Sequence, residues 1–233
     1  MTDISQGLRE VHQRIEQAAA AAGRSAAAIN LLAVSKTFGA EQVRAAYDAG
    51  QCAFGENYLQ EALAKQDALI ALRERLTWHF IGPIQSNKTR AIAERFDWVH
   101  AIDRLKIAER LAEQRPAQLP PLQVCIQVNI QGEASKSGVA PDAALELARQ
   151  IVELPRLRLR GLMSIPEATV DVDAQRIPHR ALRELAEQLR ANGIPLDTLS
   201  MGMSADLEAA VAEGATIVRV GSAIFGSRPR PLA

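Results

Sequence analysis

The sequence predicts an α/β protein, and within that class a single (β/α)8 TIM barrel with an extra N-terminal helix. From residue 30 onward, eight short apolar segments alternate with longer helical stretches. The length of 233 residues is close to the roughly 250 residues typical of such barrels. The turn after the first segment, residues 35–39, lacks the GxGxxG pattern of the alternative fold, an open doubly wound sheet. We therefore expect residues 1–233 to form one domain.

The composition excludes several classes of function. The 27 basic and 27 acidic side chains cancel, which gives no electrostatic basis for binding nucleic acid or an anionic membrane. No run of 18 apolar residues is present, so no membrane span is expected. The four histidines are scattered and no CxxC or HExxH spacing occurs, which argues against a metal site. Cys52 and Cys125 lie in apolar stretches and are expected to be buried thiols of a cytoplasmic protein.

Residues 1–24 are expected to form a helix that packs on the barrel. Apolar side chains recur there at intervals of four, three and four, at Ile4, Leu8, Val11 and Ile15, which marks one face of an amphipathic helix. Gly23 is suited to end it. At the other end of the chain, the polar and proline-rich residues 227–233 are expected to fray.

The eight candidate strands are rich in Val, Ile, Leu and Phe, as expected for parallel strands that are buried on both faces. They are residues 30–35, 52–54, 78–81, 98–102, 122–130, 159–163, 196–200 and 216–220.

The candidate helices lie between these strands, and several have recognisable ends. Ser86, Asp103 and Ser204 are suitable N-caps, and Gly50 and Gly214 are suitable stops. The helices are predicted at residues 40–49, 57–75, 86–95, 103–114, 141–152, 174–191 and 205–213.

Lys36 is the first candidate functional residue, because a barrel carries its chemistry at the carboxyl ends of its strands. A lysine held against apolar walls loses part of its preference for the charged form, and the neutral amine forms a Schiff base with an aldehyde. The alternative is a strand-end lysine that extends into solvent.

The loops after the seventh and eighth strands suggest a phosphate site. The turn Ser200-Met201-Gly202-Met203-Ser204 supplies hydroxyls and backbone amides, and Gly221 and Ser222 follow the last strand; these two loops are the common phosphate site of barrels. A plain capped turn is the alternative.

Arg219 lies within an apolar strand and must find a partner there, because a guanidinium keeps its proton. That partner is either a buried ligand atom or an acid at the strand ends such as Glu56.

Asn57 follows the second strand and could fix a hydroxyl on a ring. His79 and His100 are interpreted as hydrogen-bonded structural residues without an acid–base partner. Together these features describe a pocket for an aldehyde phosphate, which is either pyridoxal phosphate or a sugar phosphate in a lysine-dependent aldolase.

Seven motifs resemble the pyridoxal phosphate homeostasis protein family, and they cover nearly the whole chain. The motifs are AVSKTF, FGENYLQE, WHFIGPIQSNK, the pair VNI and SKSG, RGLMSIP, LSMGMSADLEAA and VRVGSAIFG. Residues 167–192 match least, and Ser222 stands where many members have threonine, which keeps the hydroxyl.

This resemblance implies a barrel like the N-terminal domain of alanine racemase, with pyridoxal 5'-phosphate as cofactor. Lys36 would bear it as an internal aldimine and Arg219 would face the pyridine nitrogen. The resemblance places the remaining site residues by function: Ser204, Gly221 and Ser222, with the backbone around Met203, at the phosphate, and Asn57, Met163 and Ser200 near the ring.

The family's role implies a carrier and buffer of the cofactor in vitamin B6 and amino-acid homeostasis, without robust catalysis. It implies no catalytic residue and no metal. Such a protein would be a monomer that makes transient contact with cofactor-free pyridoxal phosphate enzymes. The alternatives are an active pyridoxal phosphate racemase or lyase on small amino acids, and a cofactor-free Schiff-base aldolase.

Overall fold

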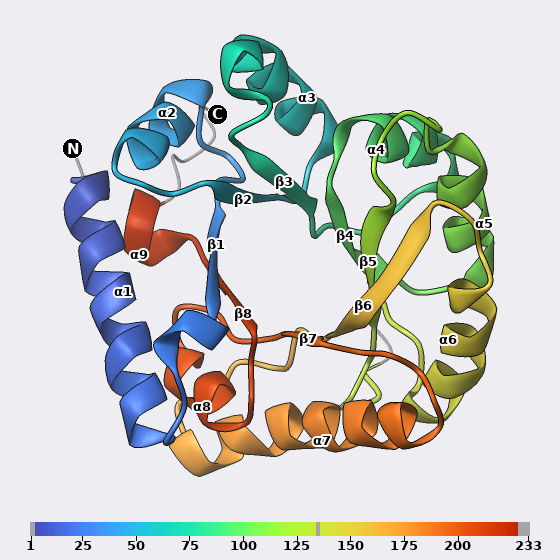
Figure 1. Ribbon diagram of the computed structural model, residues 1–233. Helices are drawn as coiled ribbons and strands as arrows, with labels where there is room; N and C mark the ends of the chain where they lie inside the picture. The colour runs from blue at the N-terminus through green and yellow to red at the C-terminus, as the bar shows by residue number, and fades with distance from the viewer. Residues whose placement is uncertain (1–2, 134–135, 228–233) are drawn as a thin grey trace.

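The computed structural model describes residues 3–133 and 136–227, in which eight parallel strands pair in sequence order and close into a barrel (Figure 1). β8 pairs with β1 and completes the closure. The strands are β1 (Asn30–Val34), β2 (Ala53–Glu56), β3 (Thr77–Phe80), β4 (Trp98–Ile102), β5 (Leu122–Gln127), β6 (Leu157–Met163), β7 (Thr198–Ser200) and β8 (Ile217–Val220). The predicted fold class is therefore confirmed.

Helices surround this barrel and cover the outer faces of the strands (Figure 1). Four of the connections also carry short 3-10 turns, at Ala26–Ala28, Ile70–Leu72, Ser86–Lys88 and Pro141–Ala143. The helices are α1 (Ile4–Ala21), α2 (Ala40–Asp48), α3 (Leu59–Ala68), α4 (Thr89–Arg95), α5 (Leu105–Gln114), α6 (Ala144–Val152), α7 (Val172–Ala191), α8 (Leu207–Ala212) and α9 (Ser222–Phe225).

Two apolar clusters hold the fold together. The larger one includes Phe54, Trp78 and Phe96, which are at most 1% exposed. The smaller one consists of Leu32, Val34, Ile81 and Ile217. Successive side chains of a strand point to opposite faces of the sheet, so one strand can contribute residues to both clusters.

The amino-terminal helix α1 packs against α8 and α9, as the spacing of its apolar residues predicts. Asp3 accepts a hydrogen bond from the amide of Gln6 and caps the helix. Gly7 brings α1 very close to α9, because a Cβ at this position would lie 2.7 Å from the carbonyl oxygen of Ala223. The helix therefore supports the segment that follows β8.

Several sequence-based boundaries are wrong in detail. The helix predicted at 57–75 ends at Ala68 and is followed by a 3-10 turn, and the strand predicted at 122–130 ends at Gln127. The predicted caps fail because three helices begin later. Ser86 begins a 3-10 turn, while Arg104 and Asp206 occupy the N-cap positions predicted for Asp103 and Ser204.

The two cysteines have different environments. Cys125 is buried in β5, and burial raises the pKa of its thiol to about 12. Cys52 is exposed, so the prediction that it is buried is wrong. It precedes β2 by one residue, where the chain has not yet entered the sheet.

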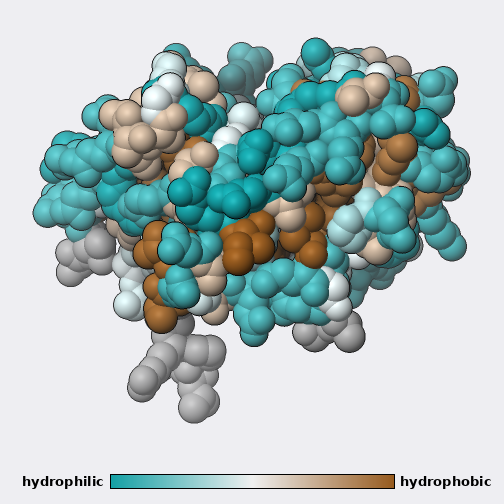
Figure 2. All heavy atoms as spheres, turned by 90° about the horizontal axis from the view of Figure 1, so that it is seen from below, coloured by the Kyte–Doolittle hydropathy of each residue, from teal (hydrophilic) through white to brown (hydrophobic). Residues whose placement is uncertain are grey.

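Figure 2 shows the face on which α7 lies, where hydrophilic side chains surround a few small apolar patches. In residues 3–133 and 136–227, no helix is long and apolar enough to cross a bilayer. The same residues contain no group of three or more His, Cys, Asp or Glu side chains that could hold a metal ion. Most of the tail predicted to fray, residues 228–233, lies outside the described residues.

Candidate functional site

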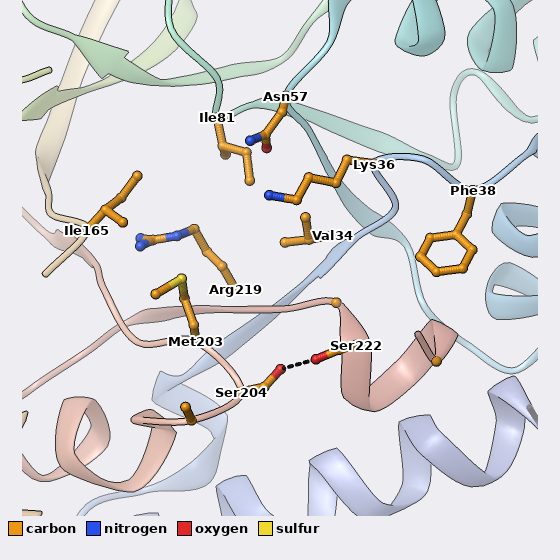
Figure 3. A pocket seen from close by; sticks show the side chains of 13 residues that line it. Val34, Lys36, Phe38, Asn57, Ile81, Ile165, Met203, Ser204, Arg219 and Ser222 are labelled. Carbon is orange, nitrogen blue, oxygen red and sulfur yellow. Dashed lines mark hydrogen bonds between the residues drawn. The ribbon is translucent and has the colours of Figure 1, made fainter. Parts of the chain in front are cut away.

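A cavity of about 310 Å³ lies at the carboxyl ends of the strands, which is within the usual range for small-molecule sites. Seven of the nine predicted site residues line it (Figure 3). These seven are Lys36, Asn57, Met203, Ser204, Arg219, Gly221 and Ser222. The remaining wall residues are Val34, Phe38, Ile81, Ile165, Ala205 and Gly226.

Lys36 follows β1 directly, and its amine points into the cavity toward Ile81 and Arg219 (Figure 3). The side chain is half-buried. Thr37 has a φ of 69°, which is unusual for a residue with a branched side chain. The Thr37 amide donates to Glu61 Oε2 over 2.9 Å, which holds this turn in place.

A buried ion pair fixes the backbone next to Lys36. Lys65 of α3 donates to Glu56 Oε1 over 2.6 Å and to the carbonyl oxygen of Ser35 over 2.7 Å. Ser35 Oγ donates to the same carboxylate over 2.5 Å. Burial raises the pKa of Glu56, although the Lys65 ammonium opposes this shift. Glu56 is thus paired with Lys65, so it is not the partner of Arg219 that the sequence left open.

Arg219 lies on β8, and its side chain reaches the cavity wall beside Met203 and Ile165 (Figure 3). It donates from Nη1 to the carbonyl oxygen of Ser200 and to Ser200 Oγ, over 2.6 and 2.8 Å, and from Nη2 to the carbonyl oxygen of Ser164 over 2.8 Å. Burial lowers the pKa of Arg219 to about 10, so the group stays charged at neutral pH. A guanidinium has five N–H bonds; within the described residues, two of those of Arg219 have no acceptor.

Asn57 lies on the cavity wall after β2 and has an unmet hydrogen-bonding need. Its Oδ1 is buried and has no hydrogen-bond partner among the described residues. Gly82 allows the Asn57 backbone to pack closely against it, because a Cβ at position 82 would lie 2.2 Å from the Asn57 carbonyl oxygen. A buried polar atom without a partner is costly, and a ligand in the cavity would supply one.

Two serines form the opposite end of the cavity (Figure 3). Ser222 Oγ and Ser204 Oγ are 3.4 Å apart; Ser222 is the first residue of α9, after β8, and Ser204 lies in the turn after β7. Among the described residues, the amides of Ser204, Ala205, Ser222 and Ala223 have no acceptor. Converging hydroxyls and free amides are the donors that an anion such as a phosphate needs.

Side chains from distant helices position this serine loop. Arg14 of α1 donates to the carbonyl oxygen of Ser204 over 3.0 Å and also pairs with Glu208 at 2.8 Å. The Met203 amide donates to Asp206 Oδ1 over 2.6 Å, and His179 Nε2 lies 2.9 Å from Asp206 Oδ2. Burial acts to raise the pKa of Asp206, but the hydrogen bonds from His179 and the Met203 amide lower it. Arg14 and Asp206 could not be recognised from the sequence, since no local pattern marks contacts between distant segments.

Met163 and Ser200, the other two predicted site residues, are fully buried and do not line the cavity. They are opposite each other in the pairing of β6 with β7. Ser200 lies behind Arg219 and holds its guanidinium. The apolar wall instead includes Ile81 and Ile165, which the sequence analysis did not single out.

His79 and His100 are buried inside the barrel and joined by a hydrogen bond of 2.9 Å, in agreement with their structural interpretation. Burial lowers the pKa of His79 to about 3. Burial, the neighbouring ring of His79 and the charge of Arg219 hold the pKa of His100 well below its usual value. Both rings are therefore neutral near pH 7.

These neutral histidines predict a loss of stability in acid. The unfolded chain protonates each histidine near pH 6.5, whereas the folded protein does so only at much lower pH. Below pH 6.5 the unfolded state therefore binds more protons, and the free energy of unfolding falls with pH. His79 accounts for a loss of about 2 kcal/mol at pH 5, and His100 adds to the loss in the same direction.

Urea unfolding between pH 7.5 and pH 5 measures this loss. His79→Phe should make the decline with pH shallower, and His12→Gln, at an exposed position, should leave it unchanged. An equal decline in the wild-type protein and the His79→Phe variant would show that His79 is not held neutral.

The fold and cavity define a class: a (β/α)8-barrel protein with a small-molecule site at the carboxyl ends of its strands. Residues 8–229 match the family model of the alanine racemase N-terminal domain. The chain belongs to this family and, within it, to the pyridoxal phosphate homeostasis proteins.

Curated relatives match over almost their whole length. The pyridoxal phosphate homeostasis protein of Pseudomonas aeruginosa is 60% identical over 228 residues, which is 98% of this chain and 97% of the relative. The protein of the same name from Escherichia coli is 52% identical over 229 residues, 98% of each chain.

Solved structures agree with this family. The structure of PipY from Synechococcus elongatus with PLP bound has a TM-score of 0.83 and 36% identity, and the match covers 96% of this chain and 100% of PipY. Alanine racemase from Corynebacterium glutamicum has a TM-score of 0.70 at 17% identity, over 99% of this chain and 62% of the racemase. The second likeness is one of fold alone.

Proposed function

We propose that this protein binds pyridoxal 5'-phosphate and carries and buffers it, as part of the balance of vitamin B6 and of amino acids in the cell. The observation that carries the proposal is one cavity with an amine, a guanidinium with two unused N–H bonds and a pair of serine hydroxyls. These groups match the aldehyde, the ring nitrogen and the phosphate of that cofactor. The names of the relatives and the PLP-bound PipY structure support the same ligand.

Each residue has a role in this proposal. The bound cofactor supplies an aldehyde that forms a reversible Schiff base with an amine, and Lys36 is the amine that would hold it. The apolar side chains of Val34 and Ile81 exclude water around Lys36. Ser204 and Ser222 would bind the phosphate, and Asn57 would satisfy its buried oxygen with a ring substituent.

Arg219 favours storage of the cofactor over catalysis. It can only donate hydrogen bonds, so a ring nitrogen that faces it must accept and stays unprotonated. An unprotonated ring withdraws electrons less strongly, which weakens the stabilisation of carbanions on which amino-acid chemistry depends. Among the described residues that line the cavity, Lys36 is the one group suited to act as a general base.

The second candidate function is that of a racemase or lyase on small amino acids, which the fold of alanine racemase suggests. Exchange of the amino-acid α-proton with deuterium from solvent distinguishes the two functions. With the loaded protein and a panel of amino acids, we expect little exchange above that of free cofactor. Rapid exchange that depends on Lys36 would overturn the carrier function and support the enzyme.

Retention of the phosphate should depend on Ser204. Ser204→Ala removes one donor from a charged acceptor, which costs about 1–3 kcal/mol, or roughly 5- to 150-fold in affinity. Equilibrium binding of pyridoxal phosphate by fluorescence titration measures this, with the exposed Ser25→Ala as control. Unchanged affinity in the Ser204 variant would contradict the assignment of the phosphate end.

We propose that residues 1–233 form one domain of a cytoplasmic monomer, which contacts cofactor-free pyridoxal phosphate enzymes transiently. Sedimentation of the loaded protein should give a single species with the mass of one chain, and a stable dimer would contradict this part.

A further inference from the structure

A line of hydrogen-bonded side chains crosses the inside of the barrel, beginning at Arg219. Ser200 Oγ accepts from Arg219 Nη1 over 2.8 Å and lies 2.8 Å from His100 Nδ1. His100 Nε2 in turn lies 2.9 Å from His79 Nδ1. These four side chains come from β8, β7, β4 and β3, and none is more than 5% exposed.

The line ends in a second cavity, which has a volume of about 510 Å³ and lies at the amino ends of the strands. The lining of this lower cavity includes the first residues of β1, β3, β4, β7 and β8. His79 is part of the lining, and its ring stacks on that of Trp98 at 5.3 Å. The guanidinium carbon of Arg160 lies 4.9 Å from the centre of the Trp98 ring. Arg160 also forms an ion pair with Asp197 at 2.8 Å.

Arg219 and the need of the buried Ser200 hydroxyl for an acceptor together set the direction of the hydrogen bonds in this line. A guanidinium only donates, so Ser200 Oγ accepts from Arg219. Ser200 is fully buried, and among the described residues His100 Nδ1 is the one acceptor within reach of its hydroxyl hydrogen. A hydroxyl that accepted from both neighbours would leave that hydrogen buried without a partner, so Ser200 donates to His100 Nδ1. His100 then carries its proton on Nε2 and donates to His79 Nδ1. His79 therefore carries its proton on Nε2, an atom that has no acceptor among the described residues. The lower cavity thus receives an N–H donor from a buried ring.

We propose that Ser200, His100 and His79 are positioning residues for Arg219 and form a hydrogen-bond chain of fixed direction between the two cavities. The chain holds the Ser200 hydroxyl pointing away from Arg219, so that Arg219 keeps its place and its two unused N–H bonds face the ligand. A change at the lower cavity is thereby transmitted to the cofactor end. The effect on the cofactor rests on the function proposed above, whereas the direction of the chain does not.

Nitrogen NMR of the imidazole rings in the ligand-free protein tests the direction. Both His79 and His100 should be neutral and carry the proton on Nε2 throughout the range from pH 6 to pH 8. A proton on Nδ1 of either ring would overturn the chain. This measurement holds whether or not the protein binds pyridoxal phosphate.

Two ligands separate positioning of Arg219 from a general effect on the fold. Pyridoxal phosphate uses the amine, the serines and Arg219, whereas glyceraldehyde 3-phosphate offers an aldehyde and a phosphate without a ring nitrogen. His100→Leu should weaken binding of pyridoxal phosphate roughly 3- to 10-fold, the scale of one hydrogen bond, and leave that of glyceraldehyde 3-phosphate unchanged. His79→Phe keeps the stacking on Trp98 and should have the same selective effect from the far end of the chain.

Phe96→Leu is the matched control, because Phe96 is as buried as His100 and its ring packs against Phe80, which is not one of the four hydrogen-bonded side chains. It should lower stability without changing the ratio of the two affinities. An unchanged ratio in both histidine variants would overturn the positioning role. If the wild-type protein bound no pyridoxal phosphate at all, the proposed function would fail, and the NMR measurement would still decide the direction of the chain.

Discussion

Replacement of Lys36 by alanine is expected to abolish covalent retention of pyridoxal phosphate. The wild-type protein should absorb visible light after incubation with the cofactor and gel filtration, and borohydride should fix the adduct. Lys36→Ala lacks the amine and should keep at most the weaker contacts of Ser204, Ser222 and Arg219 with the ligand. Lys36→Arg is a second test, because it keeps a positive charge but supplies no amine for a Schiff base.

The control for this experiment is Lys106→Ala, an exposed lysine of α5 on the outside of the barrel. It should retain the full adduct. A reduced adduct of equal yield in the wild-type protein and the Lys36→Ala variant would place the reactive amine elsewhere and refute the assignment of Lys36.

The second large effect is expected at the ion pair between Lys65 and Glu56. Lys65→Met keeps the apolar length of the side chain but leaves the Glu56 carboxylate buried without its cation. Loss of one partner from a buried pair costs about 3–5 kcal/mol of stability. Urea unfolding at pH 7.5 measures this loss. The Ser35 carbonyl also loses a donor, so the turn that carries Lys36 should loosen.

A second substitution shows whether the cost comes from the uncompensated charge. In the double variant Lys65→Met/Glu56→Gln no net charge is buried, and most of the lost stability should return. If Lys65→Met alone were as stable as the wild type, the pair would not anchor this part of the barrel. If the double variant recovered nothing, packing rather than charge would explain the loss.

The strands, and the position of Lys36 at their carboxyl ends, could be predicted from the sequence because their signals are local. A strand buried on both faces is a short apolar run, and the residue that follows it lies at the carboxyl end of the barrel. This is why Lys36, Asn57 and Ser222 line the same cavity. The helix starts were harder to predict. Ser204 is a residue type that often caps helices, but residues 204–206 form a turn before α8 begins.

The contacts that support the site could not be predicted, because they join residues far apart in the sequence. Arg14 reaches the Ser204 loop across 190 positions, and no pattern near residue 14 marks this contact. The pairing of Lys65 with Glu56 also depends on how α3 packs on β2. The line from Arg219 to His79 appears only when the register of four strands is known.

The most direct test of the account is a structure of the protein crystallised with pyridoxal phosphate. We expect continuous density between the cofactor and Lys36 Nζ, the phosphate between Ser204 and Ser222, and the ring nitrogen against Arg219. Cofactor bound outside this cavity, or inside it with the phosphate turned toward Arg219, would contradict the central claim that these groups together form its binding site.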